Sequence, residues 1–294
     1  MRLDDESESD HVEDRRGDGG GGSGLGRVGG LGIGGVLIAL VISYFTGIDP
    51  RTLIGIEQTV QGARQSSAPP SQPIDPTNDP QAATKSEVLK ILKKTENTWG
   101  ALFQEMGSNY KKPKLVLYTG VTQTACGRGQ AAMGPFYCPG DQKVYLDMAF
   151  FDEMTRRFKA GGDFARAYVI AHEIGHHVQD LLGITAKTDA LRGKMNDVQY
   201  NKVSVRVELQ ADCFAGAWAY HANKTHPFLD PNDIDEALTA ANAIGDDALQ
   251  RAARGAVVPD SFTHGTSAQR VRWFKTGFET GNLQACDTFA AQRL

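Results

Sequence analysis

The segment His172-Glu173-Ile174-Gly175-His176 places two histidines four residues apart, with a glutamate directly after the first. On an α-helix, residues four apart project from one face, so both imidazoles could bind the same cation. Neutral imidazole is a common zinc ligand. Glu173 is rotated by about 100° from His172, so it could take a proton from water beside the metal. This spacing is typical of metal-assisted hydrolysis with Glu173 as the general base.

A catalytic zinc site needs a third protein ligand and an open position for water. Gln179 and Leu182 stand where the longer HExxHxxGxxH motif would place its glycine and its last histidine. Glu208 lies 32 residues after His176, which leaves room for a loop and a returning helix. The sequence therefore predicts His172, His176 and Glu208 as the ligands of one Zn²⁺ ion.

Asp212 follows Glu208 by one helical turn and shares its face. A carboxylate there could accept the second N–H of a ligand histidine and fix its tautomer. Ala211, Phe214 and Trp218 are apolar neighbours that indicate a half-buried helix. The alternative for Glu208 is a solvated helix glutamate, but the apolar neighbours favour a ligand.

Hydrophobic periodicity predicts the elements that carry these residues. The apolar positions predict a buried helix over 164–183 and a second helix over 200–223. Other segments of the chain show the same helical period or a short β-like pattern. We expect helices over 85–106, 149–159, 232–253 and 267–279, and strands over 115–118 and 144–146. The fold class predicted is α+β, mostly helical, with a small sheet.

The first third of the chain differs in composition from the rest. Residues 1–28 hold eight acidic residues and four arginines with almost no apolar content, which predicts a disordered head. Residues 29–48 are an uncharged run of twenty residues, long enough for one transmembrane helix. A buried core helix and a cleaved signal peptide are the alternatives. Residues 49–82 are predicted to be a Pro- and Ser-rich linker, and residues 83–294 the folded domain.

Four cysteines follow the apolar run: Cys126, Cys138, Cys213 and Cys286. An even number at wide spacing favours two disulfides in an oxidising compartment, and four free thiols are the alternative. Cys126 and Cys138 enclose a short loop rich in glycine and proline and form the natural local pair. That pairing leaves Cys213 with Cys286.

The charge and cysteine patterns predict the location. Three arginines before the apolar run and two shortly after it weakly favour a cytoplasmic N-terminus. Disulfides would place the folded domain in the periplasm or outside the cell, with the bilayer contacted through residues 29–48. The net charge of −4 belongs to residues 1–28, and the neutral remainder gives no footprint for nucleic acid.

Three segments together resemble a known family. HEIGHHVQ, ELQADCFAGAW and THGTSAQR resemble the bacterial neutral zinc metallopeptidases, which are single-pass membrane proteins. Their order is also similar to that of the gluzincins, which combine HExxH with a glutamate in an ExxxD helix. The resemblance covers the apolar run and residues 83–294 but not the acidic head. It implies a zincin-like metallopeptidase domain, one zinc ion, and a protein or peptide substrate.

The segment THGTSAQR resembles the region where related gluzincins place a histidine followed by an arginine. This resemblance implies that His264 stabilises the oxyanion of the reaction. Gly265 stands where such relatives often have proline. The alternative for His264 is a loop histidine that caps the helix starting near Ser267.

Two further hypotheses concern substrate binding and other histidines. Tyr145 and Asp147 could form an edge strand beside the cleft, where an extended substrate would pair by strand addition. His177 lies off the ligand face and is expected to pack or to form hydrogen bonds. His221 and His226 stand near a predicted helix end.

Competing functions use the same residues. A zinc-dependent amidase acting on a cell-wall peptide link would need the same metal and base. A non-catalytic envelope scaffold could keep zinc for stability. A structural site usually closes with four protein ligands and has no need of a base, so Glu173 favours an enzyme.

Overall fold

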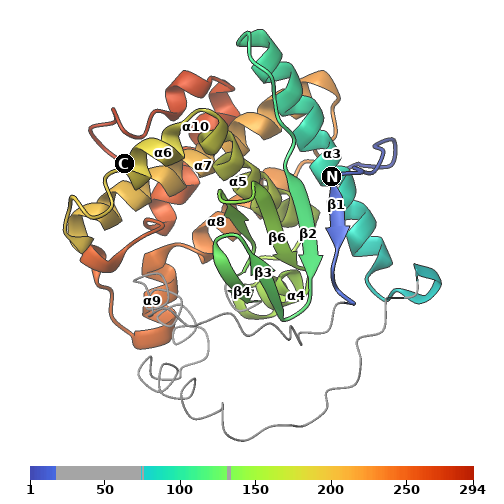
Figure 1. The fold of residues 1–294 in the computed structure, drawn as a ribbon, viewed down its shortest axis with the longest axis horizontal. Helices are drawn as coiled ribbons and strands as arrows, with labels where there is room; N and C mark the ends of the chain where they lie inside the picture. Colours follow the sequence, from blue (N-terminus) through green and yellow to red (C-terminus); the bar gives the residue numbers. More distant parts are fainter. Residues whose placement is uncertain (18–73, 75, 131–133) are drawn as a thin grey trace, which may run out of the picture.

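The computed structural model describes residues 1–17, 74, 76–130 and 134–294. Helices dominate this part of the chain, and the predicted α+β class is confirmed (Figure 1). The helices are α3 (Ala82–Glu105), α4 (Ala149–Phe158), α5 (Asp163–Leu181), α6 (Ile184–Asp189), α7 (Asp197–Thr225), α8 (Asp233–Ala243), α9 (Asp246–Arg254) and α10 (Ser267–Thr280). The strands are β1 (Val12–Asp14), β2 (Lys114–Tyr118), β3 (Val121–Thr124), β4 (Gly127–Gln130), β5 (Phe136–Cys138) and β6 (Lys143–Asp147).

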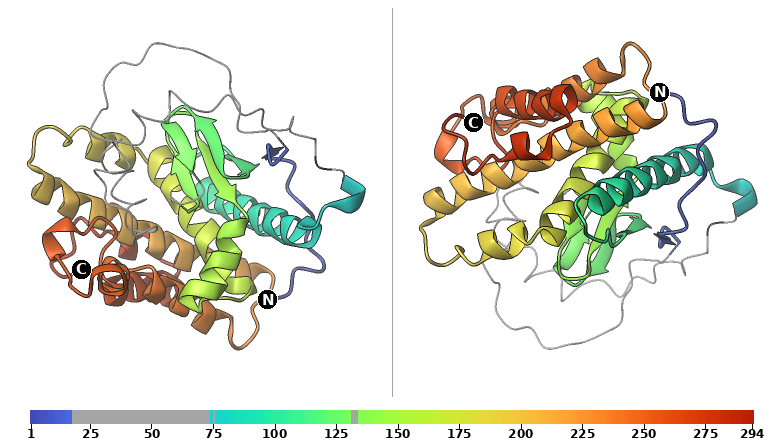
Figure 2. Two further views of the ribbon diagram at one scale, coloured as in Figure 1. Left: turned by 90° about the horizontal axis from the view of Figure 1, so that it is seen from below. Right: turned by 90° about the horizontal axis from the view of Figure 1, so that it is seen from above.

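The elements form successive layers (Figure 2). Helices α3 and α5 lie against one face of the sheet, α7 packs on α5, and α10 packs on α7. The sheet contributes Leu115, Leu117, Val144 and Leu146 to the main core. Alternation along β2 and β6 puts Val116 and other residues on the opposite face. Helix α5 therefore lies between the sheet and the other helices, with buried residues over most of its length.

Helices α7 and α10 pack with their backbones almost in contact. A Cβ atom on Gly277 would lie 1.9 Å from the carbonyl oxygen of Cys213. A Cβ atom on Gly216 would lie 2.0 Å from the carbonyl oxygen of Phe274. No side chain fits at either position, so the two glycines allow α10 to bring its inward-facing residues against α7.

The sheet has the order β1-β2-β6-β5, with β1, β2 and β6 parallel and β5 antiparallel to β6. Strand β6 is therefore an inner strand, and the prediction of an edge strand at Tyr145 and Asp147 is wrong. The Tyr145 hydroxyl donates to Asp141 at 2.7 Å. Asp147 accepts the backbone N–H groups of Gly120 and Ala149. Both side chains hold the sheet and its loops in place, and the edge strand on this side is β5.

Residues 1–17 are part of the folded domain, so the predicted disorder of the head is wrong for this segment. Strand β1 pairs with β2, and Leu3 is buried in the main core. The Ser9 hydroxyl donates to the buried Glu96 carboxylate at 2.7 Å. The buried Arg16 guanidinium pairs with Asp79 at 2.6 Å. Several charges of the head are thus paired with charges of the domain, among them Glu6 with Lys94, Glu13 with Lys143 and Asp14 with Lys85.

Other boundaries differ in detail. The helix predicted over 232–253 is two helices, because the backbone is extended at Gly245 between α8 and α9. The sequence patterns did not predict helix α6 or the strands β1, β3, β4 and β5. The apolar run 29–48 lies outside the described residues, as does most of the predicted linker. None of the described helices has the length and apolar character needed to cross a bilayer.

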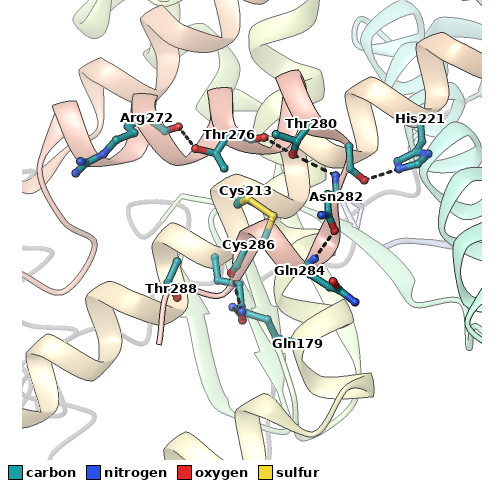
Figure 3. The surroundings of a disulfide bond; sticks show 12 residues. Gln179, Cys213, His221, Arg272, Thr276, Thr280, Asn282, Gln284, Cys286 and Thr288 are labelled. Atoms are coloured by element: carbon teal, nitrogen blue, oxygen red, sulfur yellow. Dashed lines mark hydrogen bonds between the residues drawn. A yellow bond between two sulfur atoms is a disulfide. The ribbon is translucent and has the colours of Figure 1, made fainter. Parts of the chain in front are cut away.

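Both disulfides have the pairing that the spacing favours. Cys126–Cys138 ties the turn between β3 and β4 to the edge strand β5. Cys213–Cys286 ties α7 to the short 3-10 helix Leu283–Cys286 that follows α10 (Figure 3). The C-terminal segment is therefore covalently fixed one residue away from Asp212.

Candidate metal centre

Helix α5 carries the HExxH residues and crosses α7 at very short range. A Cβ atom on Gly175 would lie 3.0 Å from the carbonyl oxygen of Ala211 and 3.1 Å from its Cα. A larger residue would push the two backbones apart. The glycine inside the motif therefore allows the face bearing His172 and His176 to meet the face bearing Glu208.

Side-chain hydrogen bonds fix the start of each helix that contributes to the centre. Asn196 and Gln199 form a reciprocal capping box at the start of α7. Thr266 and Gln269 do the same for α10. The Glu236 carboxylate accepts the backbone N–H of the second residue of α5 at 3.0 Å. These contacts fix where each helix begins and hence which residues face the centre.

The three predicted ligands lie together. The Nε2 atom of His172 is 3.1 Å from a carboxylate oxygen of Glu208, and Nε2 of His176 is 3.6 Å from the same oxygen. One donor atom from each residue lies within 4.8 Å of the others. Their side chains are 8%, 17% and 16% exposed for His172, His176 and Glu208, so the group is shielded but reachable.

Hydrogen bonds fix the tautomers of both histidines. Nδ1 of His172 lies 2.8 Å from the Asp212 carboxylate, and Nδ1 of His176 lies 2.9 Å from Oε1 of Gln179. Both partners are acceptors, so each Nδ1 carries the proton and each Nε2 presents a lone pair. Two lone pairs then face the Glu208 carboxylate, an arrangement that only a cation or added protons can stabilise. Two imidazoles and one carboxylate fit a zinc ion.

In the metal-free chain, protons take the place of that cation. Burial lowers the pKa of His176, but the facing Glu208 carboxylate outweighs it and raises the pKa to about 9. Burial alone would raise the pKa of Glu208, yet the facing histidines hold it well below its ordinary value. The centre thus favours positive charge between these side chains.

The Asp212 carboxylate is fully buried and has three further contacts. Arg270 donates to its two oxygens at 2.8 and 2.9 Å, and the Tyr168 hydroxyl donates at 2.6 Å. Burial raises the pKa of Asp212, but Arg270 and His172 lower it more, to about 2. Asp212 therefore stays ionised and can accept the His172 proton, as the sequence predicted.

Sequence reasoning assigned no role to Tyr168, Arg270 or Gln179. Tyr168 stands four residues before His172, on the same face of α5. Arg270 ends the segment THGTSAQR and is 3% exposed. Helical spacing could have found Tyr168. The partner of Arg270 depends on the crossing of α7 and α10, which no local pattern shows.

The predicted base Glu173 lies beside the ligands in a cleft of about 640 Å³, lined also by His264. It is 8% exposed, and burial raises its pKa, although the neighbouring histidines oppose the change. No hydrogen bond to its carboxylate is found within the described residues. The group is therefore available to a water molecule in the cleft.

His264 lies on the loop before α10, and the Asp246 carboxylate holds that loop. One Asp246 oxygen accepts the backbone N–H groups of Thr263, His264 and Gly265 at 2.7–2.9 Å. The other oxygen is 3.3 Å from Nδ1 of His264. The alternative role as a helix cap is wrong, because Thr266 is the capping residue.

Two of the remaining histidines serve the fold. His177 is buried, and its Nε2 donates to the backbone carbonyl of Lys111 at 2.6 Å, as expected for a packing residue. His221 bonds the carbonyl of Gly281 at 2.7 Å, and His226 is exposed. Among the described residues, the His172, His176 and Glu208 group is the only cluster with the spacing of a metal site.

Comparison with known proteins agrees with this geometry. The chain matches the family model described as "Putative neutral zinc metallopeptidase" over residues 1–289. The chain belongs to this family. The match begins at residue 1, so the expectation that the head lies outside the family was wrong.

Two relatives match two thirds or more of the chain. "Uncharacterized protein YpfJ" of Escherichia coli (strain K12) is 48% identical over 297 residues, which is 98% of this chain and 99% of the relative. "Uncharacterized protein Mb2605" of Mycobacterium bovis is 42% identical over 210 residues, 68% of this chain and 70% of the relative. No solved structure matches the chain.

Zinc uptake by the metal-free chain should release protons at pH 7. The pKa of His176 is raised to about 9, so this residue is protonated at pH 7, and a metal ion must displace that proton. Apparent zinc affinity should therefore rise with pH from 6 to 9, by about tenfold per unit for each proton displaced. Calorimetry in buffers of different ionisation enthalpy measures the proton count.

The exposed His226 provides the control for that measurement. The His226→Gln variant should release as many protons as the wild type. Zinc binding without proton release, or an affinity independent of pH between 6 and 8, would contradict the facing arrangement of His176 and Glu208.

Proposed function

We propose that this chain is a zinc endopeptidase of gluzincin type, with His172, His176 and Glu208 as metal ligands and Glu173 as the general base. One observation carries the proposal. The lone pairs of two imidazoles and a carboxylate converge on one point in a cleft, beside a carboxylate with no hydrogen-bond partner among the described residues. Membership of the zinc metallopeptidase family supports the same reading.

Each side chain of the site has its own role in hydrolysis. Zinc, when bound, supplies a Lewis acid that lowers the pKa of water and polarises a carbonyl group. Glu173 removes the proton from the attacking water and returns it to the leaving nitrogen. Burial lowers the pKa of His264, but the Glu208 and Asp246 carboxylates raise it above its ordinary value. As an imidazolium whose Nδ1 faces Asp246, His264 can donate from Nε2 to the oxyanion that develops on the carbonyl oxygen. Arg270 and Tyr168 hold Asp212, which orients His172.

The walls of the cleft favour a polypeptide substrate. Pro135, Phe136 and Tyr137 line it at strand β5, whose outer edge has no partner strand among the described residues. An extended peptide could pair with such an edge through its main chain. Apolar side chains from the helices face the same space: Phe150, Phe158, Val169, Ile244 and Leu249. This lining suits the side chains of an unfolded protein better than a sugar-linked cell-wall fragment.

Glu173→Gln should abolish peptide cleavage without loss of the metal. The amide keeps the shape of the side chain but cannot accept the proton of water, so we expect a rate lower by about 10²–10⁴-fold. His172→Ala and Glu208→Ala should lose zinc as well as activity. Cleavage of an unfolded protein, with metal analysis of each variant, tests these outcomes.

Glu105→Gln provides a matched control, because this glutamate is exposed on α3, and its rate should equal that of the wild type. A Glu173→Gln variant that retains full activity would exclude Glu173 as the base. A zinc-loaded wild type that cleaves no peptide would instead favour the scaffold alternative.

The contact between residues 1–17 (the head) and the folded domain that follows residue 74 (the body) limits where the chain can lie relative to a membrane. We propose that both lie on one side of the membrane, outside the cytoplasm. Two disulfides favour an oxidising compartment. Strand β1 pairs with β2, and a single crossing between residues 17 and 74 would separate these two strands. This pairing argues against the predicted cytoplasmic N-terminus.

Single added cysteines test this arrangement in intact cells. Ser7 in the head and Ser108 after α3 are both exposed, and all four natural cysteines are in disulfides. We expect Ser7→Cys and Ser108→Cys in the full chain to react alike with a membrane-impermeant maleimide, without permeabilisation. Reaction of only one of the two cysteines would contradict the proposal that the head and the body lie on the same side of the membrane. Reaction of both only after permeabilisation would overturn the location outside the cytoplasm.

A further inference from the structure

A buried row of amide groups leads from His176 to the C-terminal segment. Nδ1 of His176 meets Oε1 of Gln179 at 2.9 Å, and Nε2 of Gln179 meets Oε1 of Gln210 at 3.0 Å. Nε2 of Gln210 meets the backbone carbonyl oxygen of Cys286 at 3.0 Å. Gln179 is fully buried and Gln210 is 5% exposed, so water cannot replace these partners without cost.

The direction of this row is set from its far end. A backbone carbonyl can only accept, so Gln210 must turn its NH₂ group toward Cys286 and its oxygen toward Gln179. Gln179 must then turn its NH₂ group toward Gln210 and also toward the carbonyl of Val207, 2.8 Å away. Its oxygen is left for His176. His176 must therefore carry its proton on Nδ1, which leaves the Nε2 lone pair facing Glu208.

The far end of the row is held firmly. The disulfide Cys213–Cys286 joins the C-terminal segment to α7, as Figure 3 shows together with Gln179 and Thr288. The Thr288 hydroxyl donates to the carbonyl of Arg206 at 2.6 Å, and Arg206 donates back to the carbonyl of Thr288. The Cys286 carbonyl is thus fixed relative to α7 by covalent and hydrogen-bonded contacts on both sides.

We propose that Gln179 and Gln210 are positioning residues for the metal ligand His176, and that the Cys213–Cys286 disulfide anchors their chain of hydrogen bonds. The inference rests on the proposed metal site but concerns residues outside it. His172 takes its orientation from the charged Asp212. His176 takes its orientation from the neutral amides of Gln179 and Gln210. The carbonyl of the disulfide-linked Cys286 sets which end of each amide donates and which accepts.

The two glutamines of the row should differ in how strongly they affect zinc affinity. Gln179 contacts His176 directly, and removal of such a partner commonly lowers metal affinity by about 10–100-fold. Gln210 acts one step further away, and the Val207 carbonyl still orients Gln179 when Gln210 is absent. We therefore expect removal of the Gln210 amide to lower zinc affinity less than removal of the Gln179 amide. Loss of the disulfide that holds Cys286 should lower zinc affinity about as much as loss of the Gln210 amide.

The test measures zinc affinity of the full chain by competition with a chelator. Gln179→Leu, of similar volume, should bind zinc about 10–100-fold more weakly, and Gln210→Leu about threefold to tenfold more weakly. Nitrogen NMR of the metal-free wild type, recorded at a pH above the His176 pKa of about 9, where the ring carries one proton, should find that proton on Nδ1. In Gln179→Leu it should find a mixture of tautomers. A merely structural role would leave this NMR signature unchanged.

Two controls separate positioning from general loss of stability. Thr95→Val removes a buried hydrogen bond in α3, a helix that contributes no side chain to the centre, and should leave zinc affinity unchanged. Serine at both Cys213 and Cys286 should weaken zinc about threefold to tenfold, whereas serine at both Cys126 and Cys138 should not.

The outcomes distinguish the two proposals. The positioning role would be overturned by a Gln179→Leu variant that keeps the zinc affinity and the His176 tautomer of the wild type. If Gln179→Leu does not fold, the same result in Gln210→Leu would overturn it. Equal zinc affinity for the two disulfide variants would overturn the role of Cys213–Cys286. A wild-type chain that binds no zinc would instead contradict the metal site itself.

Discussion

The structure depends on the repulsion between three lone-pair donors that face one another across a few ångströms. Two imidazole nitrogens, at His172 and His176, point toward the carboxylate of Glu208, and all three are largely withdrawn from water. Such an arrangement is costly without positive charge between the groups. It exists because α5 and α7 cross with almost no space between them at Gly175. The same geometry, which is costly without positive charge, is suited to hold a divalent cation.

Two different supports keep the imidazoles in this orientation. His172 is held by Asp212, which Arg270 and Tyr168 keep ionised and fixed. Arg270 arrives from α10, whose close approach to α7 is possible only because glycines occupy the crossing. His176 is held by neutral amides that end at the C-terminal segment. Elements far apart in sequence therefore converge on one candidate cation site, while β5 and the apolar helix residues line the cleft beside it.

Sequence patterns predicted what depends on local spacing. The HExxH residues, the ligand Glu208 and its neighbour Asp212 follow helical periods, and the structure brings all of them together. Contacts between distant segments were beyond such patterns. Strand β1 pairs with residues about a hundred positions later, and its charged neighbours resemble those of a disordered segment. Tyr145 was misplaced because alternation identifies a strand but does not say which strands lie on either side of it.

The most direct test of the metal centre is anomalous diffraction at the zinc absorption edge from crystals of the full chain. We expect one peak about 2.0–2.1 Å from Nε2 of His172, from Nε2 of His176 and from a Glu208 oxygen. Glu173 should lie beside the peak without bonding to it. A zinc-loaded crystal with no peak between these three side chains, or with the peak elsewhere in the chain, would contradict the proposed metal centre.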